Sequence, residues 1–245
     1  MFLEGILAGI KKMNEIIEPI QKAVNILYNS FSKIAKEIVE WARPYKVVLL
    51  LGENQYIYWD YLDDIIMDKI LNSNNINKTL REINKAKNFA DIHDIILQCE
   101  KSVWIVPYKK LFKQSVKAFM NCDNELALFG FIAIIDGLLS DVSKNSTTGI
   151  FKRIDPILKK LEEREVIGND EYAELVFLMT FRDTMESFSK NITFESKEPK
   201  NLNRHWIMHG RSRRRKTRLD CIKMIRFIYS IILLDKFSQK EVSKL

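Results

Sequence analysis

Apolar residues recur at steps of three and four positions along most of this chain, which is the spacing that puts side chains on one face of an α-helix. The longest such run extends from Ile6 to Trp41. Glycine and proline, which end helices and form β-turns, number only 8 and 5 among 245 residues. With 47% apolar residues the chain can also bury a substantial core. These features together predict an all-α fold.

The same spacing predicts further helices, separated by polar or proline-containing segments. Val47–Leu51 is apolar but too short for periodicity to classify. Pro107 interrupts the pattern, so we expect an N-terminal helical region, 1–106, followed by a C-terminal helical bundle, 107–245. The expected helices are Tyr56–Leu71, Thr79–Asn84, Phe89–Val106, Leu111–Leu139, Phe151–Glu165, Asp170–Lys190 and Arg218–Phe237.

Cysteine usage and the distribution of apolar residues favour a cytoplasmic location. Cys99, Cys122 and Cys221 are odd in number and far apart in sequence, which suits neither a disulfide framework nor a zinc site. The first ten residues lack the basic start and cleavage site of a signal peptide. No apolar run approaches the ~20 residues of a membrane helix. We therefore expect reduced thiols and no membrane partner.

The net charge of +7 is concentrated in one short segment. Of 39 basic residues, seven lie between Arg204 and Arg218 without an intervening acid, which leaves 32 bases against 32 acids elsewhere. Such a cluster is typical of a surface that binds phosphates, so RNA is the expected partner. The candidate RNA-binding residues that follow Arg204 are Arg211, Arg213, Arg214, Arg215, Lys216 and Arg218.

Two of the three histidines lie in the segment Asn203-Arg-His-Trp-Ile-Met-His-Gly210, directly before these bases. Histidine is the side chain that titrates near neutral pH, as a general base or acid must. Arginine carries a permanent charge, and its planar fork matches phosphate oxygens. RNA is cleaved when its 2′-OH attacks the adjacent phosphate, a reaction that needs both groups and no metal. Gly210 is a natural helix stop.

Arg204, four intervening residues and His209, with His205 in the polar place, resemble the signature of the HEPN superfamily. The resemblance extends over about the last 140 residues and includes the apolar helix around Ala127–Gly137. It implies a metal-independent endoribonuclease that leaves a 2′,3′-cyclic phosphate and requires no cofactor. It also implies a homodimer in which the two motifs meet. A role in bacterial defence or in a toxin system, with an inhibitory or sensor partner, follows from the same resemblance.

On this interpretation Arg204 stabilises the charge of the phosphorane and His209 acts as general base or acid. Asn203 and His205 support them, and Asp136 orients one of these side chains. The Arg–His offset of five corresponds to ~140° around an ideal helix, so the two side chains converge only through Arg's long stem, an irregular turn or the partner subunit. Arg204 could instead be a surface residue, and His209 a satisfied helix-end histidine.

Three further alternatives stay open in the sequence. His205 and His209 have the i, i+4 spacing of two zinc ligands, although Trp206 stands where the zinc motif HExxH has glutamate and no third ligand is near. Trp206 could stack on a base or belong to the core. Asp136 could equally be a helix-end residue, and His93 is expected to be an ordinary surface residue.

Two other functions compete with catalysis. The chain could be a non-catalytic HEPN-like module that binds RNA or a protein, or a helical interaction protein without RNA binding, which would show no salt-sensitive retention of RNA. Residues 1–106 carry no motif that assigns them a role, and sensing, inhibition and dimerisation are all open.

Overall fold

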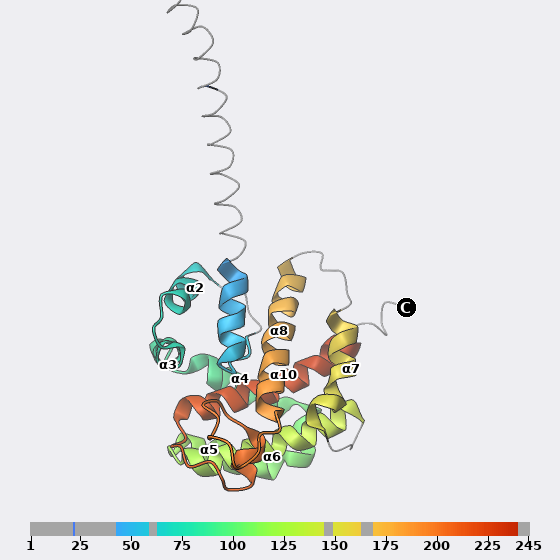
Figure 1. Ribbon diagram of the computed structural model, residues 1–245. Helices are drawn as coiled ribbons and strands as arrows, with labels where there is room; N and C mark the ends of the chain where they lie inside the picture. Colours follow the sequence, from blue (N-terminus) through green and yellow to red (C-terminus); the bar gives the residue numbers. More distant parts are fainter. Residues whose placement is uncertain (1–21, 23–42, 59–62, 145–148, 163–168, 240–245) are drawn as a thin grey trace, which may run out of the picture. The chain divides into compact units, whose positions relative to one another are not determined.

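The computed structural model describes residues 22, 43–58, 63–144, 149–162 and 169–239 (Figure 1). None of these residues forms a strand and every regular element is helical, which confirms the predicted all-α class. The helix predicted from Ile6 to Trp41 lies outside the described residues, apart from Lys22. The chain divides into two compact units, Met1–Tyr45 and Lys46–Leu245, and nearly all of the described residues belong to the second.

Helices joined by loops make up the described part of the second unit. Residues 46–53 are helical, and residues 54–58 leave that helix as a turn and an extended segment. The later elements are α2 (Asp64–Leu71), α3 (Ile76–Ala86), α4 (Ala90–Lys101), the 3₁₀-helix η1 (Val103–Tyr108), α5 (Lys109–Met120), α6 (Asn124–Ser143), α7 (Ile150–Glu162), α8 (Asn169–Ser189), α9 (Arg204–Met208) and α10 (Arg218–Gln239).

The helices α6 and α10 form the centre of this unit and pack against each other. On α6 the packing extends to α5 and α7, and on α10 it extends to α4 (Figure 1). Pro107, the expected domain boundary, falls inside η1 and inside this one unit, because α4 before it and α6 after it both pack on α10.

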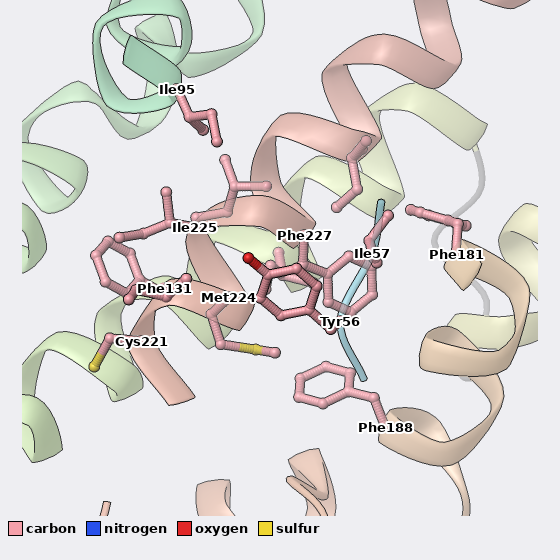
Figure 2. Close-up of a cluster of buried hydrophobic side chains, with 14 of the residues drawn as sticks. Tyr56, Ile57, Ile95, Phe131, Phe181, Phe188, Cys221, Met224, Ile225 and Phe227 are labelled. Carbon is pink, nitrogen blue, oxygen red and sulfur yellow. The ribbon is translucent and has the colours of Figure 1, made fainter. Parts of the chain in front are cut away.

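Large aromatic side chains fill the core between α8 and α10. Phe227 of α10 is fully buried, with its ring edge-on to Phe181 and Phe188 of α8 at 5.4 Å in each case. Figure 2 shows these rings together with Tyr56 and Ile57 from the extended segment. Each such ring buries roughly 150–250 Å², so aromatic packing dominates the energetics of this part of the core.

The predicted helix Leu111–Leu139 is two helices in the structure, because Cys122 adopts a left-handed conformation (φ 63°). Its N–H donates to Phe119 O and the N–H of Asp123 donates to Ala118 O, the two bonds of a Schellman helix end. Asp123 then caps α6 by accepting from Leu126 N at 3.3 Å. No glycine marks this turn, so the periodicity runs through it.

The predicted helix Tyr56–Leu71 is shorter than expected, because its beginning is held in an extended form by distant partners. Ile57 O accepts from the buried Arg226 Nε at 2.8 Å, and Tyr58 N donates to Thr180 Oγ1 at 3.1 Å. Among the described residues of this stretch the helical part is α2, which begins after Asp63 caps Ile66 N at 2.8 Å. Tertiary hydrogen bonds have here overridden the helical pattern.

The helix α6 is also the most apolar of the described helices. By length and composition it could cross a membrane, contrary to the expectation that no run approaches that length. Half of its most apolar stretch is buried inside the unit, where it packs against α5, α7 and α10. This position is that of a central core helix, whose contacts with three other helices favour the same apolar composition.

Candidate functional site

The five-residue helix α9 carries the motif and is defined by hydrogen bonds at both ends. Asn203, which is buried, accepts from Trp206 N at 3.1 Å and donates to Lys190 O at 2.8 Å. At the other end Gly210 (φ 66°) donates to Ile207 O, and Arg211 N donates to Trp206 O. The predicted helix stop at Gly210 is therefore confirmed. Asn203 acts as an N-cap that also anchors α9 to the end of α8.

Arg204 lies at the start of α9 and reaches across to α6. Its Nη2 donates to Asp136 Oδ2 at 2.7 Å, and each side chain is about one-third exposed, at 33% and 34%. The buried Nε of Arg204 has no hydrogen-bond partner among the described residues. Asp136, predicted to orient a side chain of the motif, thus contacts its arginine.

The histidines of α9 lie on a platform that the loop before the helix supplies. The His205 ring stacks on Phe194, with centroids 4.6 Å apart and planes within 4°. His209 contacts both rings edge-on, at 4.6 Å from His205 and 5.7 Å from Phe194. The two imidazoles are therefore adjacent, and His209 is the more exposed of the two.

Electrostatics favour a neutral His205. Its pKa is lowered first by partial burial and then by the positive charges that His209 and Arg204 present to it. Two imidazoles in contact resist being protonated together, so a positive charge on His209 disfavours the charged form of His205. The neutral imidazole is the form in which a histidine accepts a proton as a general base.

Arg204 and His209 do not meet within one chain. The hydrogen bond of Arg204 is made with Asp136, whereas the ring contacts of His209 are made with His205 and Phe194. These separate partners agree with the large angular offset that their spacing predicts. His205 lies near both residues, since the charges of His209 and Arg204 both lower its pKa.

Trp206 belongs to the core rather than to the exposed site. It is 7% exposed, its indole N–H donates to Ile192 O at 3.2 Å, and it packs edge-on against Phe194. Phe194 was missed by sequence reasoning, because it lies in a proline-containing segment between the expected helix Asp170–Lys190 and the motif. It is the lone aromatic residue in that segment, and this is the one signal that could have identified it.

The basic segment after Gly210 is an ordered loop whose first part is held by the carboxylate of Glu198. Glu198 accepts from Ser212 Oγ at 2.5 Å and from the backbone N–H groups of Arg213 and Arg214 at 3.1 and 3.4 Å. Burial tends to raise the pKa of Glu198, but these bonds and the charge of Lys216 lower it overall. Glu198 thus remains ionised and fixes the loop to the segment that carries Phe194.

Three of the predicted RNA-binding residues make contacts inside the protein. Arg214 forms a two-bond ion pair with Asp220 at 3.1 and 3.2 Å. Lys216 is 4% exposed and donates to Ser212 Oγ and Arg214 O, each at 2.6 Å. Arg218 lies between the rings of Phe89 and Phe119, at 4.7 and 4.6 Å.

The other three bases of the loop, Arg211, Arg213 and Arg215, are exposed. Arg211 lies over the Phe194 ring at 4.9 Å, and this is the ring that both histidines contact. This is the distance at which a guanidinium interacts with an aromatic face. The exposed positive charge therefore begins at the histidine pair and continues along the loop.

The described residues contain no group of three or more histidine, cysteine, aspartate or glutamate side chains placed to hold a metal ion. His205 and His209 are close, yet the groups around them are an arginine and an aromatic ring. Cys99 and Cys221 are buried, and burial raises the pKa of Cys221 to about 12. His93, expected at the surface, is exposed on α4.

We compared the chain with protein-family models, with curated proteins and with solved structures, and found no match in any of them. The resemblance to the HEPN superfamily therefore stays a prediction that rests on the motif and its helical setting.

Proposed function

We propose that this chain is a metal-independent endoribonuclease whose reacting groups are His209, His205 and Arg204. One observation carries the proposal: two imidazoles in contact, 4.6 Å between ring centroids, beside an arginine and at the start of an exposed basic loop. A titratable pair, a fixed cation and a surface that attracts phosphate are together what cleavage through the 2′-OH needs.

The chemistry divides between the two histidines. His205 accepts the proton of the 2′-OH in its neutral form, as its lowered pKa favours. The 2′-oxygen then attacks phosphorus, the bond to the 5′-oxygen breaks, and His209 protonates that leaving oxygen. Arg204 offsets the negative charge of the phosphorane. The products are a 2′,3′-cyclic phosphate and a 5′-hydroxyl, and no step requires a metal or a cofactor.

The loop positions RNA without reading its sequence. Arg211, Arg213 and Arg215 are exposed and reach phosphates, which fixes the strand but specifies no base. The contacts of Arg214, Lys216 and Arg218 within the protein hold the loop in place. Their charges add to its positive electrostatic potential. Phe194, half-buried beneath His205, offers its remaining edge rather than a free face to a base.

The active form in this proposal is a homodimer. Within one chain Asp136 holds Arg204 away from His209, so a second subunit would complete the charge clamp, as the family resemblance implies. Mixing Arg204→Ala protein with His209→Ala protein tests this. Restored cleavage in the mixture supports a shared site, whereas no restoration supports a site complete in each chain.

A second candidate function is a non-catalytic module that binds RNA. The observation that favours it is the Arg204–Asp136 ion pair, because a guanidinium already neutralised by a carboxylate offers less charge to a phosphorane. This candidate shares the basic loop and predicts salt-sensitive RNA binding without cleavage.

The biological setting follows the resemblance. We propose a cytoplasmic enzyme of a bacterial defence or toxin system, because unspecific RNA cleavage harms the cell that holds it. Such an enzyme needs restraint, by an inhibitory or sensor partner.

A cleavage assay on total RNA separates the two functions. We expect the purified full-length protein to degrade RNA in EDTA, and His209→Ala, His205→Ala and Arg204→Ala to be slower by about 10²–10⁴-fold. His93→Ala, an exposed histidine on α4, is the matched control and should retain full activity. RNA that stays intact with the wild-type protein would support the binding module.

A further inference from the structure

A second concentration of positive charge surrounds a partly open pocket of about 200 Å³, lined by the first two turns of α3 and α10, the residues just before α10 and the segment before α9. Four basic side chains line it against a single acid, Asp220, and amide side chains supply most of the other polar groups. The charged residues of this lining, with the amide that contacts one of them, are Asn77, Arg81, Lys200, Arg214, Asp220 and Lys223.

Lys223 is the feature of this pocket that most needs an explanation. It is 4% exposed, and its ammonium makes one hydrogen bond, to Asn77 Oδ1 at 2.7 Å. An ammonium has three N–H donors, so two find no acceptor among the described residues. A buried charge with a single neutral partner is costly, and proteins seldom keep one without a counter-ion.

The one acid of the pocket is already engaged. Asp220 accepts both bonds from Arg214, and also Thr217 N at 2.8 Å and Thr217 Oγ1 at 2.9 Å. Asp220 lies near enough to favour the charge of Lys223, but burial and Arg214 outweigh it and lower the Lys223 pKa to about 8. Among the described residues Arg81, Lys200 and Lys223 form no ion pair.

Both helices that open onto the pocket begin there, which adds to its positive potential. Asn75 is the N-cap of α3, and Thr217 with Asp220 forms the reciprocal cap of α10. The positive ends of two helix dipoles therefore point toward the same cavity. Asn77 is oriented by its own amide, which donates to Asn54 Oδ1 at 3.3 Å, so its oxygen faces Lys223.

We propose that this pocket binds a phosphomonoester, the terminal phosphate of a small ligand or of an RNA end, with Lys223 as its buried anchor and Arg81 and Lys200 at its rim. A phosphomonoester carries up to two negative charges and three strong acceptor oxygens, which matches the three cations without a counter-ion. A phosphodiester within a strand has one charge and two flanking sugars, and it fits a buried ammonium less well. The site does not depend on the proposed ribonuclease activity.

Titration calorimetry of the full-length protein at pH 7 and low salt tests the proposal. The probes are inorganic phosphate, AMP and adenosine, and a short oligoribonucleotide with either a 5′-phosphate or a 5′-hydroxyl. We expect phosphate and AMP to bind and adenosine not to bind. The oligoribonucleotide pair identifies the source: binding that needs the 5′-phosphate and Lys223 assigns an RNA end, and its absence assigns a free small ligand.

The matched variants are Lys223→Met, which keeps the stem and removes the charge, and Lys113→Met, an exposed lysine on α5 away from the pocket. Lys223→Met should weaken phosphate binding at least tenfold, and Lys113→Met should leave it unchanged. Arg81→Gln changes an exposed side chain at the rim of the pocket, so it should weaken phosphate binding without disturbing a buried group. No phosphate binding by the wild-type protein, or equal binding by Lys223→Met, would overturn the proposal.

Discussion

Asp136 decides how much positive charge Arg204 can offer to a substrate. Its carboxylate holds the guanidinium at 2.7 Å and turns it toward α6. Asp136→Asn keeps the size of the side chain but removes the countercharge. If Arg204 is a clamp positioned by Asp136, we expect kcat to fall by about 10²-fold with KM little changed, since small misplacements of reacting groups cost that much.

The control for this variant is Asp141→Asn, further along α6, where the carboxylate accepts from Tyr108 Oη at 2.8 Å. It should leave kcat unchanged. An Asp136→Asn protein that binds RNA more tightly and shows no change in kcat would indicate that the ion pair restrains binding and has no role in catalysis.

The buried Lys223 leads to a prediction about how the free energy of unfolding depends on pH, and this prediction can be tested without a ligand. Its pKa is lowered from 10.5 to about 8 in the folded protein, so between these values the unfolded chain binds more protons. Stability must then rise with pH across that window, by about 3 kcal/mol for this group. Urea unfolding of wild type and Lys223→Met between pH 7 and 10.5 measures the difference.

We expect Lys223→Met to be the more stable protein at pH 7, because it no longer buries an ammonium, and the advantage to shrink toward pH 10.5. A difference between the two proteins that stays constant with pH would show that Lys223 keeps an ordinary pKa.

At the scale of elements, the basic loop has some bases that face solvent and others that hold the loop in place, and charge reversal can distinguish these two roles. Arg213 and Arg215 are exposed, whereas Arg214 is paired with Asp220. Arg213→Glu/Arg215→Glu should weaken RNA binding for all sequences and reduce the log–log salt slope by ~0.7 per lost contact on single strands. Its melting temperature should stay near that of wild type, which differential scanning calorimetry would check.

Arg214→Glu should instead lower the melting temperature, since it places two carboxylates together at the start of α10. A salt slope unchanged by the double reversal would remove the loop from the RNA-binding surface.

The contact between α5 and α6 depends on Gly130. A Cβ at that position would overlap Ser115 Oγ and lie 3.1 Å from Ser115 Cβ. Gly130→Ala should therefore destabilise the protein by about 1–3 kcal/mol, despite the better helix propensity of alanine. Adding Ser115→Ala removes the overlapping oxygen and should recover part of the loss in a double-mutant cycle. If the effects of the two substitutions on the free energy of unfolding simply add, α5 and α6 can move apart to accommodate the new Cβ.

Elements with local signals were predictable from the sequence, and those set by distant partners were not. Asn203 and Gly210 define α9 through bonds within a few residues, so its end could be read directly. The extended segment at Tyr58 depends on Thr180, and the turn at Cys122 has no glycine to mark it.

The candidate site shows the same division. The histidine pair and Asp136 were identifiable from the sequence. The histidines lie beside an arginine and a basic segment, and Asp136 is an isolated acid in an apolar helix. Phe194 and Glu198 lie in the loop before α9 and contact His205 and the basic loop. These contacts could not be predicted, because the fold brings together residues up to 15 positions apart. Which loop bases face inward, as Lys216 does, is likewise set by tertiary packing.

At the scale of the whole second unit, α6 connects the core to the candidate chemistry. Its buried face packs on α10, Asp136 near its C-terminal half holds Arg204, and Glu125 in its first turn accepts from Lys216 N at 3.2 Å. The motif helix and the basic loop are thus both tied to the same core helix. Changes at the exposed His209 should therefore alter chemistry without unfolding the protein.

The central claim, that His209 and its neighbours promote attack by the 2′-OH, is tested most directly with one oligoribonucleotide in two forms. One form is all RNA, and the other has a single 2′-deoxy sugar on the 5′ side of the mapped cleavage site. In EDTA we predict that wild-type protein cleaves only the first, leaving a 2′,3′-cyclic phosphate and a 5′-hydroxyl, and that His209→Ala cleaves neither. Cleavage of the deoxy form, or 3′-hydroxyl products, would contradict the account.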